Sequence, residues 1–228
     1  MPIYVVGAGP GDPKLLTLRA VELLSKADVV AYGDLVPEEI VKLYARGAAV
    51  VKIGHRREEH DAAVAALIEE AKRGKTVVVL KNGDPTIFGR GIQICKEAER
   101  RGVECEIVPG VSAFMAAAAL YKIELTNGTT LRHITLLSYP HVDAQTLKNA
   151  ADTLVIHMMG DHLSELVKML QDLPNVEIYA CYAITQGGKC EKTEIGKLEE
   201  YRGKKPLLII VRKVPPAPSL NSGASCGI

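Results

Sequence analysis

Short apolar segments alternate with longer amphipathic segments along the first half of the chain. Each apolar segment is rich in Val, Ile and Ala, and the segment that follows it places apolar residues at helical spacing. The expected strands are residues 3–9, 28–36, 48–54, 75–81 and 103–110. Continuous apolar strands that alternate with helices are typical of a parallel sheet covered on both faces, so this half predicts an α/β domain.

The second half repeats the alternation after a polar turn at residues 126–130, which marks the expected domain border. A helix is expected at 160–173, and the strands here look less uniformly parallel than those before the border. The predicted division is an N-terminal α/β domain at 1–125, a C-terminal α/β domain at 126–214 and a flexible tail at 215–228. The strands expected in the second domain are residues 133–139, 152–159, 177–184 and 206–213.

Composition and charge exclude several classes of partner. The 228 residues carry a net charge of +1 at pH 7, and the pI is about 7.6, so no global basic field attracts nucleic acid. Aromatic residues make up only 4%, and Trp is absent, so no platform for stacking bases is predicted. No apolar stretch is long enough to span a bilayer, and the N-terminus carries no charged leader. We therefore expect a cytoplasmic protein with no nucleic-acid or membrane partner.

The five cysteines do not form a recognisable metal motif. No pair has the C-x-x-C spacing, so we predict no metal site and expect buried free thiols instead.

Two glycine-rich loops follow expected strands, and neither matches a common phosphate-binding motif. In "GAGPGDP" (7–13), Asp12 occupies the third glycine position of the dinucleotide fingerprint, and the prolines remove backbone donors. In "NGDPTIFGRG" (82–91), the G-K-[ST] ending of a P-loop is missing. Asp84 is expected to bond its own backbone in a tight turn before Pro85.

Polar residues gather at one edge of the predicted sheet. Asp34, His55, Asp84 and Ser112 each follow an expected strand. Open α/β sheets bind ligands at the carboxyl ends of their strands, so we predict a binding site there.

Several longer motifs then indicate a family. "VVGAGPGDPKLLTLRAVELLSKADVVAYGDLV", "GDPTIFGRG", "VPGVSAFMAAAA" and "TLVIHMMG", in this order, strongly resemble the tetrapyrrole methylases of sirohaem and cobalamin synthesis. The resemblance covers about residues 3–213. It implies two α/β domains with the active-site cleft between them, a homodimer, and S-adenosyl-L-methionine as cofactor. "FGRG" (88–91) is most similar to the members that methylate uroporphyrinogen III twice, giving precorrin-2 through precorrin-1.

The resemblance also implies which residues contact the cofactor. Asp84 would pair with its ammonium group, and Met158 would form a flexible apolar wall, although core packing is the competing interpretation for Met158 and Met159. The match around Ile184 is looser than the others. The implied cofactor contacts are Pro10, Asn82, Gly83, Asp84, Ile87, Ser112, Ala113, Met158 and Ile184.

The residues expected to move protons depart from the family pattern. Gly33 fills the position of the usual Asp, so Asp34 is the nearby carboxylate that could act as base. His55 stands where a Lys is usual, and it could donate a proton or equally bind a carboxylate. Arg90 and Arg56 are expected to bind the carboxylates of the substrate.

Two other functions stay open at this point. "CYAIT" (181–185) is closer to precorrin-4 C11-methyltransferases, and Asn127 and Gly128 replace the usual His-Arg pair. A later cobalamin-ring methylase is therefore the first alternative. A non-catalytic module that binds S-adenosyl-L-methionine is the second, because the usual Tyr-Asp and Gly-Lys-Arg pairs are missing.

Overall fold

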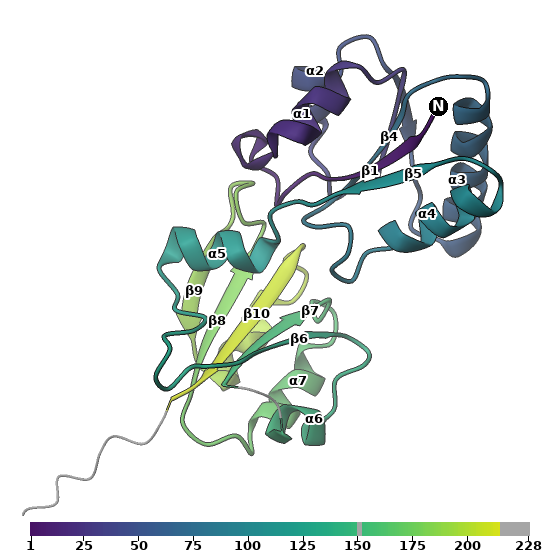
Figure 1. The fold of residues 1–228 in the computed structure, drawn as a ribbon. Coiled ribbons are helices and arrows are strands. Elements are labelled where there is room, and N and C mark those ends of the chain that lie inside the picture. The colour runs from purple at the N-terminus through teal and green to yellow at the C-terminus, as the bar shows by residue number, and fades with distance from the viewer. Residues whose placement is uncertain (150–151, 215–228) are drawn as a thin grey trace, which may run out of the picture. The chain divides into compact units, whose positions relative to one another are not determined.

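The computed structural model describes residues 1–149 and 152–214, and the predicted tail lies outside the described residues. The chain forms two compact units (Figure 1). The first contains Met1–Ile123 together with Cys181–Cys190, and the second contains Glu124–Ala180 and the chain from Glu191 onward. Each unit has its own five-stranded sheet, which confirms the predicted α/β class.

The first unit is built on a parallel sheet with the strand order β3-β2-β4-β1-β5. The predicted strands and helices all form, with bounds that differ by a few residues. The elements are β1 (Ile3–Gly7), η1 (Pro13–Leu15), α1 (Leu18–Ser25), β2 (Val29–Tyr32), α2 (Glu38–Tyr44), β3 (Ala49–Lys52), α3 (Arg57–Lys72), β4 (Val77–Lys81), α4 (Gly91–Arg100), β5 (Cys105–Val108) and α5 (Ala113–Tyr121).

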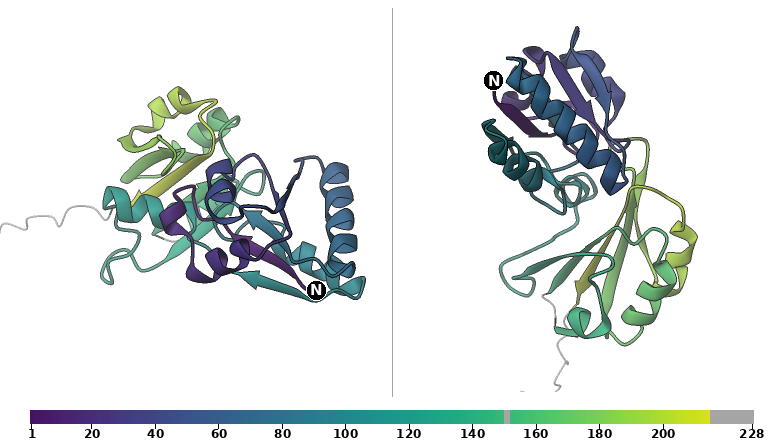
Figure 2. Two further views of the ribbon diagram at one scale, coloured as in Figure 1. Left: turned by 90° about the horizontal axis from the view of Figure 1, so that it is seen from above. Right: turned by 90° about the vertical axis from the view of Figure 1, so that its right-hand side faces the viewer.

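Helices cover both faces of this sheet (Figure 1, Figure 2). Val78 and Leu80 of β4 pack with α1 and α2 on one face, while Val77 and Val79 pack with α3 and α4 on the other. Because successive side chains of a strand point to opposite faces, a strand buried on both sides reads as one apolar run. The same alternation directs the side chain of Lys81, the last residue of β4, to the face covered by α3 and α4.

The strand order creates a switch point between β2 and β4, which are neighbours in the sheet. The chain leaves β2 for α2 on one face and leaves β4 for α4 on the other face. Ligands of open α/β sheets bind outside the carboxyl ends of strands at such a point. The fold therefore favours a site beside Asp34 and the loop that follows Lys81.

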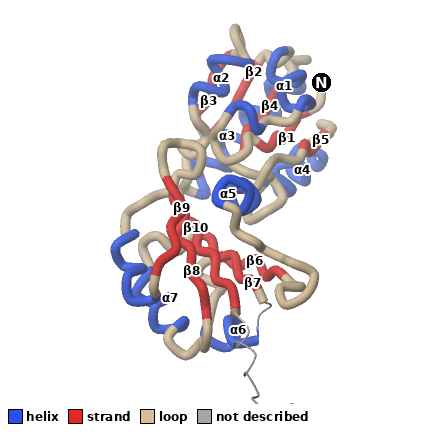
Figure 3. Tube along the Cα trace, turned by 90° about the vertical axis from the view of Figure 1, so that its left-hand side faces the viewer, coloured by secondary structure: helices blue, strands red, loops and turns tan. Residues whose placement is uncertain are grey.

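The second unit contains a mixed sheet with the order β6-β7-β10-β8-β9. β6 pairs with β7 in parallel and β7 pairs with β10 in antiparallel register, which confirms that this half is less uniformly parallel. Helices α6 and α7 lie beside this sheet (Figure 3). The elements are β6 (Ile134–Ser138), α6 (Ala144–Asn149), β7 (Thr153–His157), α7 (Leu163–Leu170), β8 (Val176–Tyr182), β9 (Lys189–Thr193), η2 (Ile195–Tyr201) and β10 (Leu207–Lys213).

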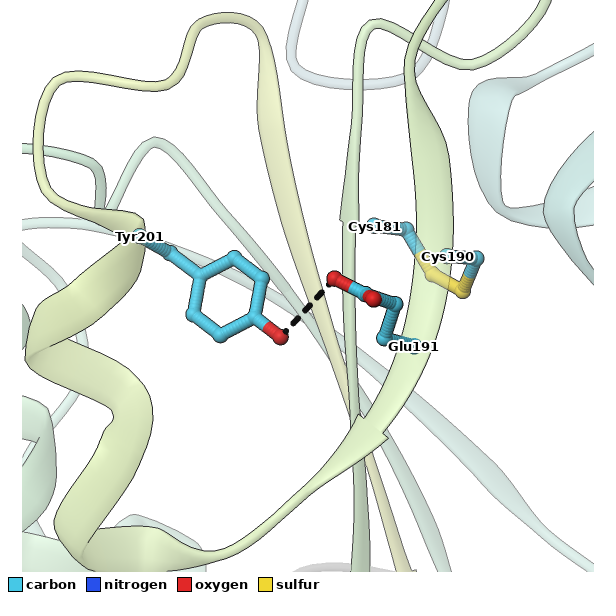
Figure 4. Close-up of a disulfide and its surroundings, with 4 residues drawn as sticks. All are labelled: Cys181, Cys190, Glu191 and Tyr201. Atoms are coloured by element: carbon cyan, nitrogen blue, oxygen red, sulfur yellow. Dashed lines mark hydrogen bonds between the residues drawn. A yellow bond between two sulfur atoms is a disulfide. The ribbon is translucent and has the colours of Figure 1, made fainter.

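The cysteines differ from the prediction of free thiols. Cys95 forms a disulfide with Cys105, and Cys181 forms a disulfide with Cys190. Figure 4 shows the second disulfide, with the Tyr201 hydroxyl donating to Glu191 Oε2 at 3.3 Å nearby in the same view. The prediction was wrong because spacing along the chain does not show which strands and helices bring two sulfur atoms together. Cys226 lies outside the described residues.

The described residues contain neither a candidate metal cluster nor a candidate membrane-spanning helix. Within residues 1–149 and 152–214, no three His, Cys, Asp or Glu side chains are grouped so that they could hold a metal ion. In the same residues, no helix has the length and apolar character needed to cross a bilayer.

Candidate active site

The loops after β1, β4 and β5 are joined at the carboxyl edge of the first sheet. Gly9 and Gly83 exchange two backbone hydrogen bonds, with N–O distances of 3.2 and 2.8 Å. A Cβ atom on Gly7 would come within 2.5 Å of Gly110 Cα and 2.8 Å of Gly83 O. Because no side chain fits at Gly7, the three loops approach one another as closely as their backbones allow.

Asp84 holds the loop after β4 in shape, as predicted. Its Oδ1 accepts hydrogen bonds from the backbone N–H of Thr86 at 2.8 Å and from the Thr86 hydroxyl at 2.5 Å. Its Oδ2 accepts from the backbone N–H of Gly110 at 2.9 Å. Burial opposes ionisation, but the hydrogen bonds from Thr86 and Gly110 outweigh it and hold the pKa of Asp84 below its ordinary value. The tight turn is confirmed, while the pairing of Asp84 with a cofactor ammonium stays a prediction.

Beside this turn, Asn82 has a polar atom that suits a ligand. Its Oδ1 is buried and has no hydrogen-bond partner among the described residues. Gly83 has a φ of 66°, and a Cβ there would lie 3.8 Å from Ser112 Cα and 3.9 Å from Ala113 N. The structure thus brings Asn82, Gly83, Ser112 and Ala113 together. A buried acceptor without a partner costs free energy, so a donor group of a bound molecule fits this position.

The segment Cys181–Cys190 lies against the first glycine loop, within the first unit. Gln186 Nε2 donates to Pro10 O at 2.7 Å, and the backbone N–H of Asp12 donates to Thr185 Oγ1 at 2.9 Å. Ile184, which directly precedes Thr185 in the sequence, is buried. The contacts join the Pro10 loop to the segment that carries Ile184. Apart from the loose match at 181–185, no sequence signal points to Thr185 or Gln186.

Two other predicted cofactor contacts lie elsewhere. The backbone N–H of Ile87 donates to Asp84 O at 3.3 Å, so Ile87 belongs to the same turn. Met158 lies in the second unit and has a φ of 66° and an exposed fraction of 57%, whereas Met159 is fully buried. Core packing therefore explains Met159 and does not explain Met158.

The structure brings the two predicted proton-transfer residues together. His55 Nε2 lies 3.0 Å from Asp34 Oδ2, and both side chains are well exposed, at 68% and 73%. They meet because Asp34 follows β2 and His55 follows β3, which are adjacent parallel strands. An exposed pair of this kind contributes little to stability. Its geometry instead suits an exchange of a proton with a bound molecule.

Arg90 and Arg56, the two predicted carboxylate-binding residues, differ in their surroundings. Arg90 Nη2 donates to the backbone oxygen of His55 at 3.4 Å. The glycines beside Arg90 pack on Pro85, because a Cβ on Gly91 would lie 2.7 Å from Pro85 O. Arg56 is the N-cap residue of α3 but makes no capping hydrogen bond with its side chain, and its Nε lies 4.0 Å from Glu59 Oε1. Arg90 thus contacts the carboxyl edge through one long hydrogen bond, while Arg56 has a loosely paired, exposed head group.

Comparison with known proteins identifies the family. The family model described as Tetrapyrrole (Corrin/Porphyrin) Methylases matches residues 2–201. The chain therefore belongs to the tetrapyrrole methylase family.

Individual relatives extend over almost the whole chain. A protein of Methanobacterium ivanovii named uroporphyrinogen-III C-methyltransferase is 36% identical, over 92% of this chain and 96% of the relative. A protein of the same name from Methanocaldococcus jannaschii is 31% identical, over 93% of this chain and 96% of the relative.

Solved structures give the same picture. A cobalt precorrin-4 methyltransferase superposes with a TM-score of 0.82 at 28% identity, covering 92% of this chain and 94% of the other. A uroporphyrin-III C-methyltransferase from Thermus thermophilus, in complex with S-adenosylhomocysteine, superposes with a TM-score of 0.78 at 29% identity, covering 93% and 98%.

Proposed function

We propose that this protein is an S-adenosyl-L-methionine-dependent C-methyltransferase that converts uroporphyrinogen III to precorrin-2 through precorrin-1. The observation that carries the proposal is its 36% identity to a uroporphyrinogen-III C-methyltransferase over 92% of the chain. The joined glycine loops and the Asp34–His55 pair support it. The product belongs to the routes to sirohaem and cobalamin, and relatives named sirohaem synthase, such as one from Pseudomonas fluorescens at 41% identity over 68% of the chain, agree with this.

The residues around Asn82 fit the cofactor. When bound, S-adenosyl-L-methionine supplies an electrophilic methyl group. The orphaned Oδ1 of Asn82 would accept a hydrogen bond from it, and the bare backbone at Gly83 would allow it to approach closely. We propose that the complete set of contacts is Pro10, Asn82, Gly83, Asp84, Ile87, Ser112, Ala113, Ile184 and Met158.

The reaction requires that the macrocycle is oriented and that a ring proton is removed. Transfer of the methyl group to a ring carbon would need the ring held in line with the donor, so residues that hold the ring in place would supply much of the rate. Asp34 would take up the ring proton released after attack, and His55, in contact with it, would exchange that proton with solvent. The guanidinium groups of Arg90 and Arg56 would bind carboxylates of the macrocycle.

We also propose a homodimer in the cytoplasm. The alanine-rich helix α5 exposes Met115, Leu120 and Tyr121, and exposed large apolar side chains on one helix suit an interface between copies. The cytoplasmic location stays a prediction, and the two disulfides are unusual for that compartment.

A precorrin-4 methyltransferase is the second candidate, because a cobalt precorrin-4 methyltransferase superposes with a TM-score of 0.82. One experiment separates the candidates. The protein is incubated with S-adenosyl-L-methionine and either uroporphyrinogen III or precorrin-4, and methylated products are followed by mass. We expect two successive methyl additions to uroporphyrinogen III and none to precorrin-4. The opposite pattern would replace the first candidate by the second, and no methylation of either, with S-adenosylhomocysteine still bound, would favour the non-catalytic module.

A further inference from the structure

Two positive side chains without a carboxylate partner lie near the end of β4. Lys81 is the last residue of β4 and is partly buried, and Arg90 directly precedes α4 and is also partly buried. Lys81 Nζ lies 3.4 Å from Nε2 of His60 on α3. Arg90 donates only to the backbone oxygen of His55, at 3.4 Å, among the hydrogen bonds of the described residues. In residues 1–149 and 152–214, no Asp or Glu forms an ion pair with either cation.

The electrostatics of this cluster favour an anion. Burial, followed by the charge of Arg90, lowers the pKa of Lys81 to about 8. Burial, then Lys81 and Arg90, also lower the pKa of His60, which is 4% exposed. Placing two partly buried cations beside each other costs free energy unless a negative charge compensates them. A negative group bound here would remove that cost.

His60 orients the ammonium group of Lys81. Its Nδ1 lies 3.4 Å from Asp61 Oδ1, and its other nitrogen faces Lys81 Nζ. A carboxylate at Nδ1 favours the tautomer with the proton on Nδ1, which leaves Nε2 free to accept from Lys81. The ammonium group then keeps its two remaining N–H donors for a ligand.

A cavity of about 260 Å³ lies between α3 and α4, and its lining includes Arg90, Gln93 and His60. Lys81 is not part of this lining, but it contacts His60, which is. The two carboxylates of the lining are already engaged. Glu97 Oε1 lies 2.6 Å from Arg101 Nε and 2.8 Å from Arg100 Nη2, and Asp61 pairs with His60 and Arg57. Pockets for drug-sized ligands measure roughly 300–1,000 Å³, so this cavity suits a side group of a larger molecule.

We propose that Lys81, oriented by His60, and Arg90 form a receptor for one carboxylate side chain of the substrate. The proposal rests on the proposed function, since it takes the ligand to be a tetrapyrrole with carboxylate side chains. Lys81 would offer its ammonium group and Arg90 its planar fork to the same carboxylate. The other source of a carboxylate is the methionine part of the cofactor, because Lys81 directly precedes Asn82.

The test compares Lys81→Met, which keeps the length of the side chain, with Lys42→Met on α2 as matched control. Lys42 is exposed and pairs with Glu38. Affinities are measured by calorimetry for uroporphyrin III, an unreactive macrocycle with the same carboxylates, and for S-adenosylhomocysteine. Lys81→Met should bind uroporphyrin III about tenfold more weakly, or weaker still, because it loses one charged hydrogen bond. The affinity of Lys81→Met for S-adenosylhomocysteine should stay unchanged, and so should both affinities of the control variant. Weaker binding of S-adenosylhomocysteine with unchanged uroporphyrin III would overturn the proposal, because the carboxylate would then be the cofactor's.

The pH dependence gives a readout that a merely structural role would not change. The groups that face Lys81 are His60 from α3 and Arg90 from the loop before α4. The lowered pKa of His60 keeps its ring neutral well below pH 8, so the change of charge near pH 8 in this cluster comes from Lys81. Uroporphyrin III affinity of the wild type should be full below about pH 8 and fall above it, and this fall should be absent in Lys81→Met. If the affinity for uroporphyrin III falls equally with pH in the wild type and in Lys81→Met, the proposed role of Lys81 is overturned.

A small tricarboxylate, tricarballylate, separates failure of the site from failure of the proposed function. If both proteins bind tricarballylate equally, the receptor does not exist. If Lys81→Met alone loses tricarballylate while the wild type does not bind uroporphyrin III, the site stands and the tetrapyrrole substrate is overturned. Loss of both ligands by Lys81→Met, with full binding by the wild type, supports the proposal.

Discussion

At the scale of single residues, the pair formed by Asp34 and His55 gives the sharpest test of the chemistry. Asp34→Asn keeps the size of the side chain and its contact with His55, 3.0 Å away, but removes the base. We expect uroporphyrinogen III to bind as before and turnover to fall by about 100-fold or more, the scale of general base catalysis. The measurement is kcat and KM with S-adenosyl-L-methionine in excess. Asp172→Asn, an exposed aspartate of the second unit that pairs with Lys148, is the control. Full activity of Asp34→Asn would show that the base lies elsewhere.

Gly83 tests whether the joined glycine loops hold the cofactor. Its φ of 66° is one that branched residues rarely adopt, and its neighbours are Ser112 and Ala113. Gly83→Val should abolish the rise in melting temperature that S-adenosylhomocysteine produces by mass action. Gly47→Val is the matched control, because Gly47 also has a positive φ, of 97°, but has no other atom near its Cβ position. That variant should lose stability from backbone strain and keep the ligand-induced shift. An equal loss of the shift in both variants would mean that strain, and not the site, is responsible.

The sequence indicates which residues lie together when they follow neighbouring strands, but it does not indicate contacts between a strand and a helix that packs on it. Asp34 and His55 could be placed together because both follow neighbouring apolar strands. Lys81 and His60 could not, because one ends a strand and the other lies within a helix twenty-one residues earlier. Their contact follows from the face that β4 presents to α3, which depends on the strand order of the whole sheet.

At the scale of elements, the apolar pattern predicted the apolar strands, including the exposed β3, and missed the charged strand β9. β9, "KCEKT", carries charged residues at both faces and pairs at the edge of the second sheet, so no apolar run indicates it. The short helix α6 buries only Leu147 among its residues and gives no periodic signal. The expected strands were too long at their carboxyl ends, since residues such as Gly33 and Ile53 belong to loops. These loops carry the site.

The segment Cys181–Cys190 provides a prediction at this scale. Its disulfide closes the loop that holds Gln186 against Pro10. Cys190→Ser should cost roughly 2–3 kcal/mol of unfolding free energy by releasing a short loop, and should also weaken S-adenosylhomocysteine binding, because Ile184 and Pro10 would no longer be held. Denaturant unfolding and calorimetry measure the two effects. Cys95→Ser, which breaks the disulfide between α4 and β5, should lower stability by a similar amount and leave the affinity unchanged. Equal affinities of both variants would exclude a role for this segment in binding.

At the scale of the whole molecule, the two compact units do not follow the order of the sequence at one segment, Cys181–Cys190. The apolar pattern and the family motifs predicted two successive α/β domains, and each compact unit does contain one sheet. The segment Cys181–Cys190 contains the end of β8 and the start of β9, which are strands of the second sheet, but it belongs to the first unit and contacts Asp12 and Pro10 there. A pattern of apolar positions cannot indicate such a return, because the contacts are made by the polar side chains of Thr185 and Gln186.

The proposed homodimer is the remaining property of the whole molecule, and α5 gives a way to test it. Leu120 is 59% exposed on this helix, close in sequence to exposed Tyr121, so a second copy could bury both. Leu120→Glu would place a charge in that interface and should shift the protein from dimer to monomer in sedimentation at micromolar concentration, without lowering the melting temperature of the monomer. Leu43→Glu on α2, where Leu43 is 43% exposed, is the control and should stay dimeric. A wild-type protein that sediments as a monomer would refute the dimer, and a dimer retained by Leu120→Glu but lost by Leu43→Glu would move the interface from α5 to α2.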